Sequence, residues 1–350
     1  MDARVWLTGF QPFGSHSDNV SKTLANQLIS TTQSVSVETT PPFGLENNKM
    51  NLIFEGTILS VDELGSRQTS ESIFEILPDA VIHLGLKESA TQVHLEMCAV
   101  NECNFRIADN SGRQLSNQLI EQSGLAMLHT TVHRPSLEIL SDQLTDVVIS
   151  EDCGRFVCNE TYYRTLHEIE SRDVRHRQRP LPAIFIHLPP IEFVSLSRQM
   201  EIVLDIAARI VQKPTIQVVG GAVISPDGKM LACRRSPGEV MAGWWELPGG
   251  KVDVGETEIE ALQREMIEEL NLNVNVGHCI GRHHHDFGPM IVNLAFYACV
   301  ADHQELTLHV HDEFKWFTEA EAPTIKWLPP DVDFILGLAE LGFMTLRDEN

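Results

Sequence analysis

The 350-residue sequence contains no uninterrupted apolar run of membrane-spanning length, and its N-terminus lacks a basic, then apolar, then cleavable signal. Cysteine is sparse: the seven cysteines are odd in number and show no framework spacing, which favours a reducing compartment over a disulfide scaffold. Basic residues are also few, 26 against 49 acidic ones, which gives a formal net charge of −23. These absences predict a cytoplasmic protein that binds neither nucleic acid nor a membrane surface.

The sequence shows neither an internal repeat nor a low-complexity segment, and it is long enough for two domains with their own cores. Apolar residues recur at helical intervals through residues 195–212, and Pro214 ends this pattern because proline disfavours helix at the residue before it. An apolar strand pattern over 216–224 follows at once. We therefore expect one domain over residues 1–213 and a second over 214–350.

Within the second domain, residues 250–272 predict a short acidic helix. Their sequence is GKVDVGETEIEALQREMIEELNL. Thr257 and Glu260 have the spacing of a capping box, which predicts that the helix begins at about Glu258. The apolar residues at helical intervals, which we expect to form a buried stripe, are Ile259, Leu262, Met266 and Leu270.

Three carboxylates share one face of this predicted helix. Glu265, Glu268 and Glu269 stand at positions i, i+3 and i+4. Convergent carboxylates repel each other unless a cation lies among them, and hard oxygen ligands suit Mg²⁺ or Mn²⁺. The alternative is an acidic helix face exposed to solvent.

The same segment resembles the Nudix box: a glycine, five residues, Glu, seven residues, then Arg-Glu-apolar-any-Glu-Glu-any-Gly-apolar. Asn271 replaces the last glycine, and Asn is the next-best residue for a left-handed helix end. The resemblance, to the MutT-type nucleotide hydrolases, covers about residues 216–340 and implies an α+β Nudix domain, an α/β/α sandwich. The matching box positions are Gly250, Glu256, Arg264, Glu265, Met266, Glu268, Glu269 and Leu272.

This resemblance implies a hydrolase that uses Mg²⁺ or Mn²⁺ to cleave a (deoxy)nucleoside triphosphate, such as the oxidised 8-oxo-dGTP, to monophosphate and pyrophosphate. Arg264 would pair with the box glutamates, and Arg234 or Arg235 would hold phosphate. A box glutamate, for which we take Glu265, would be the base. The metal set implied is Gly250, Glu265, Glu268 and Glu269.

Two parts of this domain leave alternatives open. A further ligand or base is expected near residues 309–313, where the candidates are His309, His311, Asp312 and Glu313. Asp331 and Asp333 would either recognise the nucleotide base or cap the final helix, expected over 334–341.

The first 213 residues alternate apolar strand patterns with helical patterns. The strands are expected at 5–8, 80–85 and 183–187, and the helices at 21–30, 69–77 and 158–170. This alternation predicts an α/β layered fold with a mixed or parallel sheet, in which active sites gather where strands end and helices begin.

Three residues of this domain have the chemistry of a cysteine hydrolase. Cys158 stands at a predicted helix start, where the helix dipole lowers the pKa of a thiol. His187 ends an apolar strand, and Glu96 lies in an apolar segment from which a carboxylate can orient an imidazole. The alternatives are a small core cysteine and a buried, satisfied histidine.

The domain resembles pyroglutamyl peptidase I, a cysteine peptidase that removes N-terminal pyroglutamate. The resemblance implies that Cys158 is the nucleophile, that His187 is the base and then the acid, and that Glu96 orients it. It also implies an apolar pocket for the lactam ring from Phe10 and Phe13, with Arg106 beside the site. The matching segments are 8–14 (TGFQPFG), 96–101 (EMCAVN), 106–110 (RIADN), 154–159 (GRFVCN) and 186–189 (IHLP).

One loop departs from this family. Its Gly-Gln-Ala-Gly-Gly-Arg segment is GLKESA here, at residues 85–90. The altered loop would give the peptidase a changed substrate or a low rate. The alternative is that the first domain is a noncatalytic binding or dimerising module. We expect a fusion of the two hydrolases that acts on a nucleotide and on pyroglutamyl peptides, and that forms a homo-oligomer.

Overall fold

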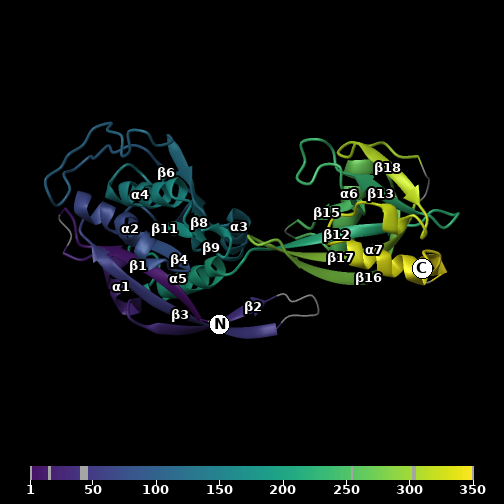
Figure 1. The fold of residues 1–350 in the computed structure, drawn as a ribbon. Helices are drawn as coiled ribbons and strands as arrows, with labels where there is room; N and C mark the ends of the chain where they lie inside the picture. Colours follow the sequence, from purple (N-terminus) through teal and green to yellow (C-terminus); the bar gives the residue numbers. More distant parts are fainter. Residues whose placement is uncertain (1, 15–16, 40–45, 254, 302–304, 349–350) are drawn as a thin grey trace. The chain divides into compact units, whose positions relative to one another are not determined.

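The computed structural model describes residues 2–14, 17–39, 46–253, 255–301 and 305–348 (Figure 1). The chain divides into two compact units: residues up to Thr39 together with Glu46–Pro214, and residues from Thr215 on. None of the helices in the described part of the chain has the length and apolar character needed to cross a membrane.

The first unit is built around a seven-stranded sheet with the order β2-β3-β1-β4-β11-β5-β8. Strands β3, β1, β4 and β11 run parallel, whereas β2 is antiparallel to β3 and β5 is antiparallel to β11. The sheet is therefore mixed. Its strands are β1 (Asp2–Phe10), β2 (Thr32–Thr39), β3 (Glu46–Leu59), β4 (Ala80–Leu86), β5 (Val93–Glu96), β8 (Val147–Ser150) and β11 (Ala183–Leu188).

Helices cover both faces of this sheet (Figure 1). Each face packs against its helices through its own apolar cluster. One cluster includes buried residues of α1, α3 and α5, and the other includes buried residues of α2 and α4. Two short strand pairs, β6–β7 and β9–β10, lie outside the main sheet. The bounds are α1 (Val20–Leu28), α2 (Glu63–Ile76), α3 (Arg134–Gln143), α4 (Val157–Ser171), α5 (Leu196–Val211), β6 (Cys98–Val100), β7 (Met127–His129), β9 (Arg175–His176) and β10 (Arg179–Pro180).

These layers confirm the α/β fold expected from the sequence, with one helix longer than expected. Helix α2 begins at Glu63 rather than at residue 69, because the side chain of Asp62 caps it by accepting a hydrogen bond from the backbone N–H of Gly65 at 2.9 Å. The first turns carry polar residues, so the apolar period alone did not reveal them.

The second unit contains a four-stranded sheet, β15-β12-β17-β16, and a three-stranded sheet, β14-β13-β18. Helix α6 packs on one apolar cluster, and α7 with α8 on the other. This arrangement agrees with the expected α+β fold. The bounds are β12 (Thr215–Val223), β13 (Met230–Arg234), β14 (Trp245–Glu246), β15 (Gly249–Lys251), α6 (Glu258–Leu270), β16 (Val274–Asp286), β17 (Ile291–Ala301), β18 (Glu313–Phe317), the 3₁₀ turn η1 (Ala322–Thr324), α7 (Val332–Leu341) and α8 (Thr345–Asp348).

Helix α6 begins at Glu258, as the sequence predicts. The Thr257 hydroxyl accepts from the Glu260 N–H at 3.2 Å, and the Glu260 carboxylate accepts from the Thr257 N–H at 2.9 Å. Asn271 ends the helix with a left-handed φ of 50°. The expected buried stripe is wrong at Ile259, which is 43% exposed, because Ala261 supplies the buried contact of the first turn.

Replacing Thr257 by Ala should destabilise the second unit by about 1 kcal/mol, the usual cost of losing an N-cap hydroxyl. Four of the five tryptophans (Trp244, Trp245, Trp316 and Trp327) belong to this unit, so urea denaturation followed by tryptophan fluorescence reports mainly on it. Thr257→Ser keeps the hydroxyl and is the matched control. An alanine variant as stable as the serine variant would contradict the contribution of the cap.

Candidate active sites

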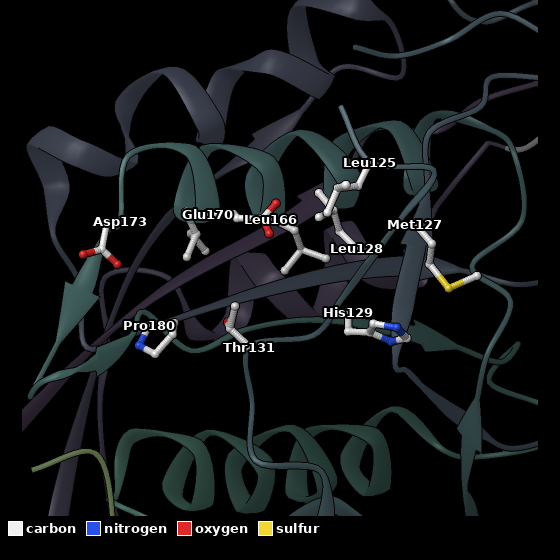
Figure 2. A pocket seen from close by; sticks show the side chains of 10 residues that line it. Leu125, Met127, Leu128, His129, Thr131, Leu166, Glu170, Asp173 and Pro180 are labelled. Atoms are coloured by element: carbon white, nitrogen blue, oxygen red, sulfur yellow. The ribbon is translucent and has the colours of Figure 1, made fainter. Parts of the chain in front are cut away.

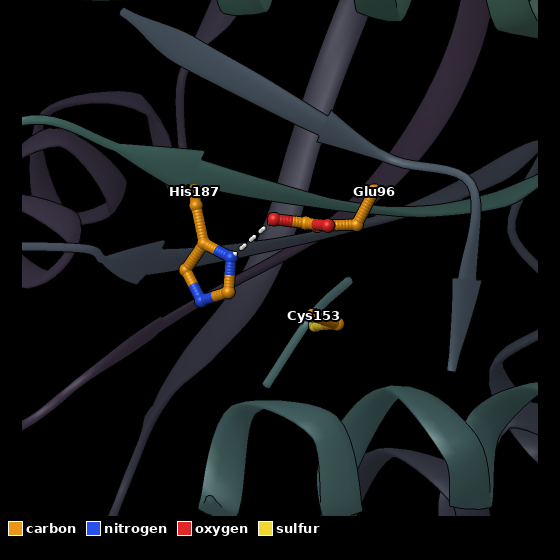
Figure 3. Close-up of side chains that lie close together, drawn as sticks. All are labelled: Glu96, Cys153 and His187. Carbon is orange, nitrogen blue, oxygen red and sulfur yellow. Dashed lines mark hydrogen bonds and ion pairs between the residues drawn. The ribbon is translucent and has the colours of Figure 1, made fainter. Parts of the chain in front are cut away.

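In the first unit, the antiparallel pairing of β5 with β11 brings Glu96 and His187 together. His94 is the register partner of His187, and Glu96 is the partner of Phe185. The His187 Nδ1 and Glu96 Oε1 atoms are 2.7 Å apart, and both side chains are buried (Figure 3). A buried carboxylate on Nδ1 fixes the ring orientation and leaves the other ring nitrogen for chemistry.

Cys158 occupies the first turn of α4 and is half-buried. Gly85 faces it from β4, where it is the register partner of His187. A Cβ on Gly85 would lie 3.1 Å from the Cys158 Sγ and 2.7 Å from the Phe185 ring. A glycine is therefore required for the thiol to approach the strands that carry His187, although no hydrogen bond joins Cys158 to His187 among the described residues.

The thiol of Cys158 is not pre-ionised. Burial, followed by the Glu96 carboxylate, raises its pKa to about 12, against a smaller lowering effect of a backbone hydrogen bond. The expectation that the helix start lowers this pKa is wrong, because desolvation of the thiolate outweighs the dipole. The thiol is protonated at neutral pH and requires a base to accept its proton during attack.

The two phenylalanines expected to form the lactam pocket lie in different packing environments. Phe10 is buried and its ring centroid is 6.2 Å from that of Phe185, which in turn is 4.7 Å from the His187 ring. Phe13 is half-buried and lies 5.9 Å from Phe156, just before the start of α4. Arg106 is exposed.

Two basic side chains at this site, Lys87 and His94, were not identified from the sequence. The Lys87 Nζ lies 3.6 Å from the Glu96 Oε1 and 3.2 Å from the His94 Nδ1. Lys87 belongs to the departing loop 85–90, so the loop contributes a cation beside the carboxylate that contacts His187. A lysine in a segment expected to lie near the substrate was the available signal.

A separate cavity of about 360 Å³ lies between the β7 region and α4 (Figure 2). None of the residues expected to form the peptidase site lines it. Its lining is Leu125, Met127, Leu128, His129, Thr131, Leu166, Ile169, Glu170, Asp173 and Pro180.

In the second unit, Arg264 holds the acidic face of α6 together. Its guanidinium contacts Glu256 at 2.9 Å, Glu265 at 2.8 Å and Glu268 at 3.4 Å. Gly250 packs so closely on the Glu265 carboxylate that a side chain there would overlap it. Gly250 and Glu265 therefore come together as expected, with Arg264 beside them.

The three expected metal ligands differ in exposure. The Glu268 side chain is 60% exposed, against 15% for Glu265 and 14% for Glu269. No three donor atoms of this set lie within 4.8 Å of one another in the part of the chain that the structure describes. The structure thus brings Glu265 and Glu269 to the same partly buried region and leaves Glu268 mainly in solvent.

Glu269 has the properties of a metal ligand. Its Oε2 atom is buried and makes no hydrogen bond to any described residue. Burial raises the pKa of Glu269 to about 7, opposed by His311. A divalent cation would satisfy the orphaned oxygen and favour the ionised form, so the residues present fit the metal that the box implies.

Among the four residues left open at 309–313, His311 approaches the box. Its Nε2 is 3.0 Å from the Glu246 Oε1, and its Nδ1 is 4.0 Å from the Glu269 Oε2. His309 is exposed, whereas Asp312 and Glu313 both pair with Arg234. The Glu246–His311 contact was not foreseen.

Both arginines expected to hold phosphate are paired with acidic side chains. Arg234 contacts Asp312 at 2.8 Å and Glu313 at 2.6 Å. Arg235 contacts Glu246 at 2.9 Å and Glu239 at 3.2 Å. A phosphate would have to replace one of these carboxylates.

Asp331 lines a cavity of about 180 Å³ together with Phe287, Leu328 and Pro330. It is 5% exposed and accepts a hydrogen bond from the Leu247 N–H at 3.4 Å. It stands at the N-cap position of α7 but forms no side-chain cap bond there. Burial, followed by Glu246, raises the pKa of Asp331 to about 8.

Asp333 does not join this site. It is exposed in the first turn of α7 and is absent from the cavity lining.

Comparison with known proteins assigns both units. The family model for pyroglutamyl peptidase matches residues 3–208, and the model for the NUDIX domain matches residues 214–336. A pyrrolidone-carboxylate peptidase of Thermococcus litoralis is 30% identical over 190 residues, which cover 53% of this chain and 76% of that protein. A CTP pyrophosphohydrolase of Escherichia coli is 33% identical over 132 residues, 38% of this chain and 93% of that protein.

Among solved structures, a pyroglutamyl peptidase I from Bacillus amyloliquefaciens is 25% identical, with a TM-score of 0.48 over 60% of this chain and 96% of that one. Both units match families of hydrolases. The chain belongs to the pyroglutamyl peptidase family through its first unit and to the Nudix family through its second.

Proposed function

We propose that the chain is a bifunctional cytoplasmic hydrolase, with a cysteine peptidase domain over residues 1–213 and a nucleotide pyrophosphohydrolase domain over 214–350. The observation that carries the first assignment is the buried 2.7 Å contact between His187 and Glu96 near Cys158. The second is supported by the orphaned Oε2 of Glu269 in an acidic box. We retain the expectation of a homo-oligomer.

In the peptidase domain, Cys158 attacks the carbonyl carbon of the pyroglutamyl bond. His187 accepts the thiol proton and then donates it to the leaving amine, while Glu96 stabilises the imidazolium. Water, deprotonated by His187, then hydrolyses the resulting thioester, which releases pyroglutamate and returns the proton to the Cys158 thiol. Because the pKa of Cys158 is about 12, proton transfer to His187 accompanies attack. We assign the apolar surface for the lactam ring to Phe10 and Phe13, and we keep Arg106, which is exposed, as the residue beside the site that the family resemblance implies.

Cys158→Ala should eliminate release of pyroglutamate from a pyroglutamyl-aminocoumarin substrate and leave nucleotide hydrolysis unchanged. The thiol is the nucleophile that cleaves the pyroglutamyl bond in the proposed reaction, and the second unit has its own sheets and apolar clusters. Fluorescence release measures the first activity and phosphate release after added pyrophosphatase the second.

Cys98→Ala, at a buried cysteine on β6, is the matched control and should retain both activities. Persistent peptidase activity in Cys158→Ala would refute the nucleophile assignment. Absence of peptidase activity in the parent protein as well would favour the noncatalytic module.

In the Nudix domain, a divalent cation (Mg²⁺, or Mn²⁺ in its place) would be held by Glu265, Glu269 and Gly250, with Glu268 at the exposed side. When bound, it neutralises the diphosphate and activates water. Arg264 keeps the box carboxylates oriented, and Glu265 acts as base. Arg234 or Arg235 exchanges a carboxylate partner for phosphate.

Glu269→Gln should lower nucleotide hydrolysis roughly a thousandfold or more, the usual effect of losing a charged ligand that stabilises transition-state charge. The change keeps side-chain volume, so circular dichroism should match that of the parent. Glu340→Gln, at an exposed position of α7, is the control and should keep full activity. Near-normal turnover of Glu269→Gln at saturating Mg²⁺ would show that the metal assignment is wrong.

The Asp331 cavity is the proposed base site. With a pKa of about 8, Asp331 is a neutral acid at pH 7, which donates one hydrogen bond and accepts another. This pattern complements the ring nitrogen and amino group of cytosine, in agreement with the CTP-hydrolysing relative. An oxidised guanine nucleotide such as 8-oxo-dGTP, whose carbonyl and imino groups also complement a neutral acid, is the second candidate.

Asp331→Asn should change the ratio of kcat/KM between CTP and 8-oxo-dGTP, whereas Asp333→Asn should leave it unchanged. Ionising Asp331 opposes folding, because its pKa rises from 3.8 in the unfolded chain to about 8 in the folded one. Stability from this group is therefore lost as pH rises from about 4 to about 8. The Tm of the Asn variant relative to the parent should increase over this range.

A nucleotide panel with Mg²⁺ at pH 6, 7 and 9, with thermal melts at each pH, measures both effects. An unchanged ranking combined with a raised Tm would assign Asp331 to structure alone.

A further inference from the structure

Cys153 lies beside the pair that Glu96 and His187 form. A carboxylate oxygen of Glu96, the Cys153 Sγ and a ring nitrogen of His187 all lie within 4.8 Å of one another, and all three side chains are buried (Figure 3). The three come from β5, the segment before α4, and β11. The peptidase reaction does not use Cys153, which also packs in the apolar cluster that includes α2 and α4.

Glu96 supplies a second observation. Its Oε1 contacts His187, but its Oε2 is buried and makes no hydrogen bond to any described residue, and the side chain is 0% exposed. A buried carboxylate oxygen without a partner is costly, and a cation bound to it removes that cost. The orphaned atom belongs to the same three-residue group as the thiol.

The donor set selects the kind of cation. Thiolate, imidazole and carboxylate together are ligands of Zn²⁺, whereas Mg²⁺ prefers oxygen alone. Zn²⁺ bonds of about 2.0–2.3 Å place neighbouring donor atoms about 3–4 Å apart, so small side-chain movements close the group around an ion. Three protein ligands leave a fourth position for water.

We propose that Glu96, Cys153 and His187 form a Zn²⁺ site that competes with the peptidase reaction. Binding releases the thiol proton of Cys153 to solvent, moves the ring proton of His187 from Nδ1 to Nε2, and replaces the hydrogen bond between His187 and Glu96 by bonds to the ion. No redox change is involved. His187 then no longer accepts the proton of Cys158, so the effect on catalysis, though not the binding itself, rests on the proposed peptidase function.

Co²⁺ is a spectroscopic substitute for Zn²⁺, because cobalt–thiolate ligation produces a near-ultraviolet absorption band that oxygen ligands do not. The full chain carrying Cys158→Ala and Cys279→Ser is titrated with Co²⁺ in excess Mg²⁺, which occupies the Nudix box. These two changes remove the nucleophile and the exposed cysteine. We expect a thiolate band that saturates at one equivalent and that Zn²⁺ abolishes.

Adding Cys153→Ala to this background should remove the band, whereas adding Cys98→Ala, at another buried cysteine, should retain it. Cys153→Ser is the second variant if the alanine change lowers the melting temperature of the first unit. A band that survives both Cys153 changes, or that is absent from the Cys158→Ala background, overturns the proposal.

Inhibition is measured on chains that keep Cys158. Zn²⁺ should inhibit pyroglutamate release, and addition of a chelator should restore the activity. Cys153→Ala should raise the half-inhibitory Zn²⁺ concentration about tenfold or more, since even partners of metal ligands contribute at least tenfold. Equal sensitivity of the two proteins contradicts competition at this site. A Cys153-dependent cobalt band in a chain without peptidase activity supports the site and refutes only the proposed peptidase function.

Discussion

A carboxylate that leaves water must find a partner, and this requirement shapes both units of the chain. Glu160 in α4 is 1% exposed and contacts Arg113 at 3.0 Å and Arg164 at 2.9 Å, beneath the segment between β6 and β7. Arg264 has the same role on α6, where it separates and neutralises carboxylates that would otherwise repel one another. Such pairs fix the loops and helices on which the sites stand.

Three carboxylates have fewer hydrogen bonds or ion pairs than these, and all three lie at the candidate active sites. Glu96 and Glu269 each have one buried oxygen without a hydrogen-bond partner among the described residues, and the described side chain of Asp331 has only a long hydrogen bond from a backbone N–H. Burial without compensation raises the pKa of both Glu269 and Asp331. In the functions proposed above, a cation or a nucleotide base supplies the missing partner of each carboxylate.

The local patterns of the sequence were sufficient for the layered α/β fold of the first unit and for part of the sites, whereas the fold of the second unit was expected from the family resemblance. A capping box depends on two residues three positions apart, so the start of α6 followed from Thr257 and Glu260 alone. Glu96 and His187 are 91 positions apart, and their contact requires the antiparallel pairing of β5 with β11. Chemistry alone made the pair one candidate among alternatives, and the resemblance to a known family favoured it, because no local rule specifies that register.

Other features depend on neighbours that the sequence does not identify. The exposure of Glu268 and of Ile259, the pairing of Arg234 with Asp312, and the position of His311 beside Glu246 are set by packing between segments far apart in the chain. The pKa of Cys158 likewise depends on how deeply α4 is buried, which outweighs the dipole of its first turn.

The connection between α5 and β12 is only three residues long, Gln212 to Pro214. Because one polypeptide carries both units, each round of translation produces one copy of each. Any change in synthesis or degradation alters the two concentrations by the same factor, so a cell cannot adjust their ratio by controlling protein abundance. Their relative output changes only when the activity of one unit is altered, for example by a ligand that acts on that unit alone.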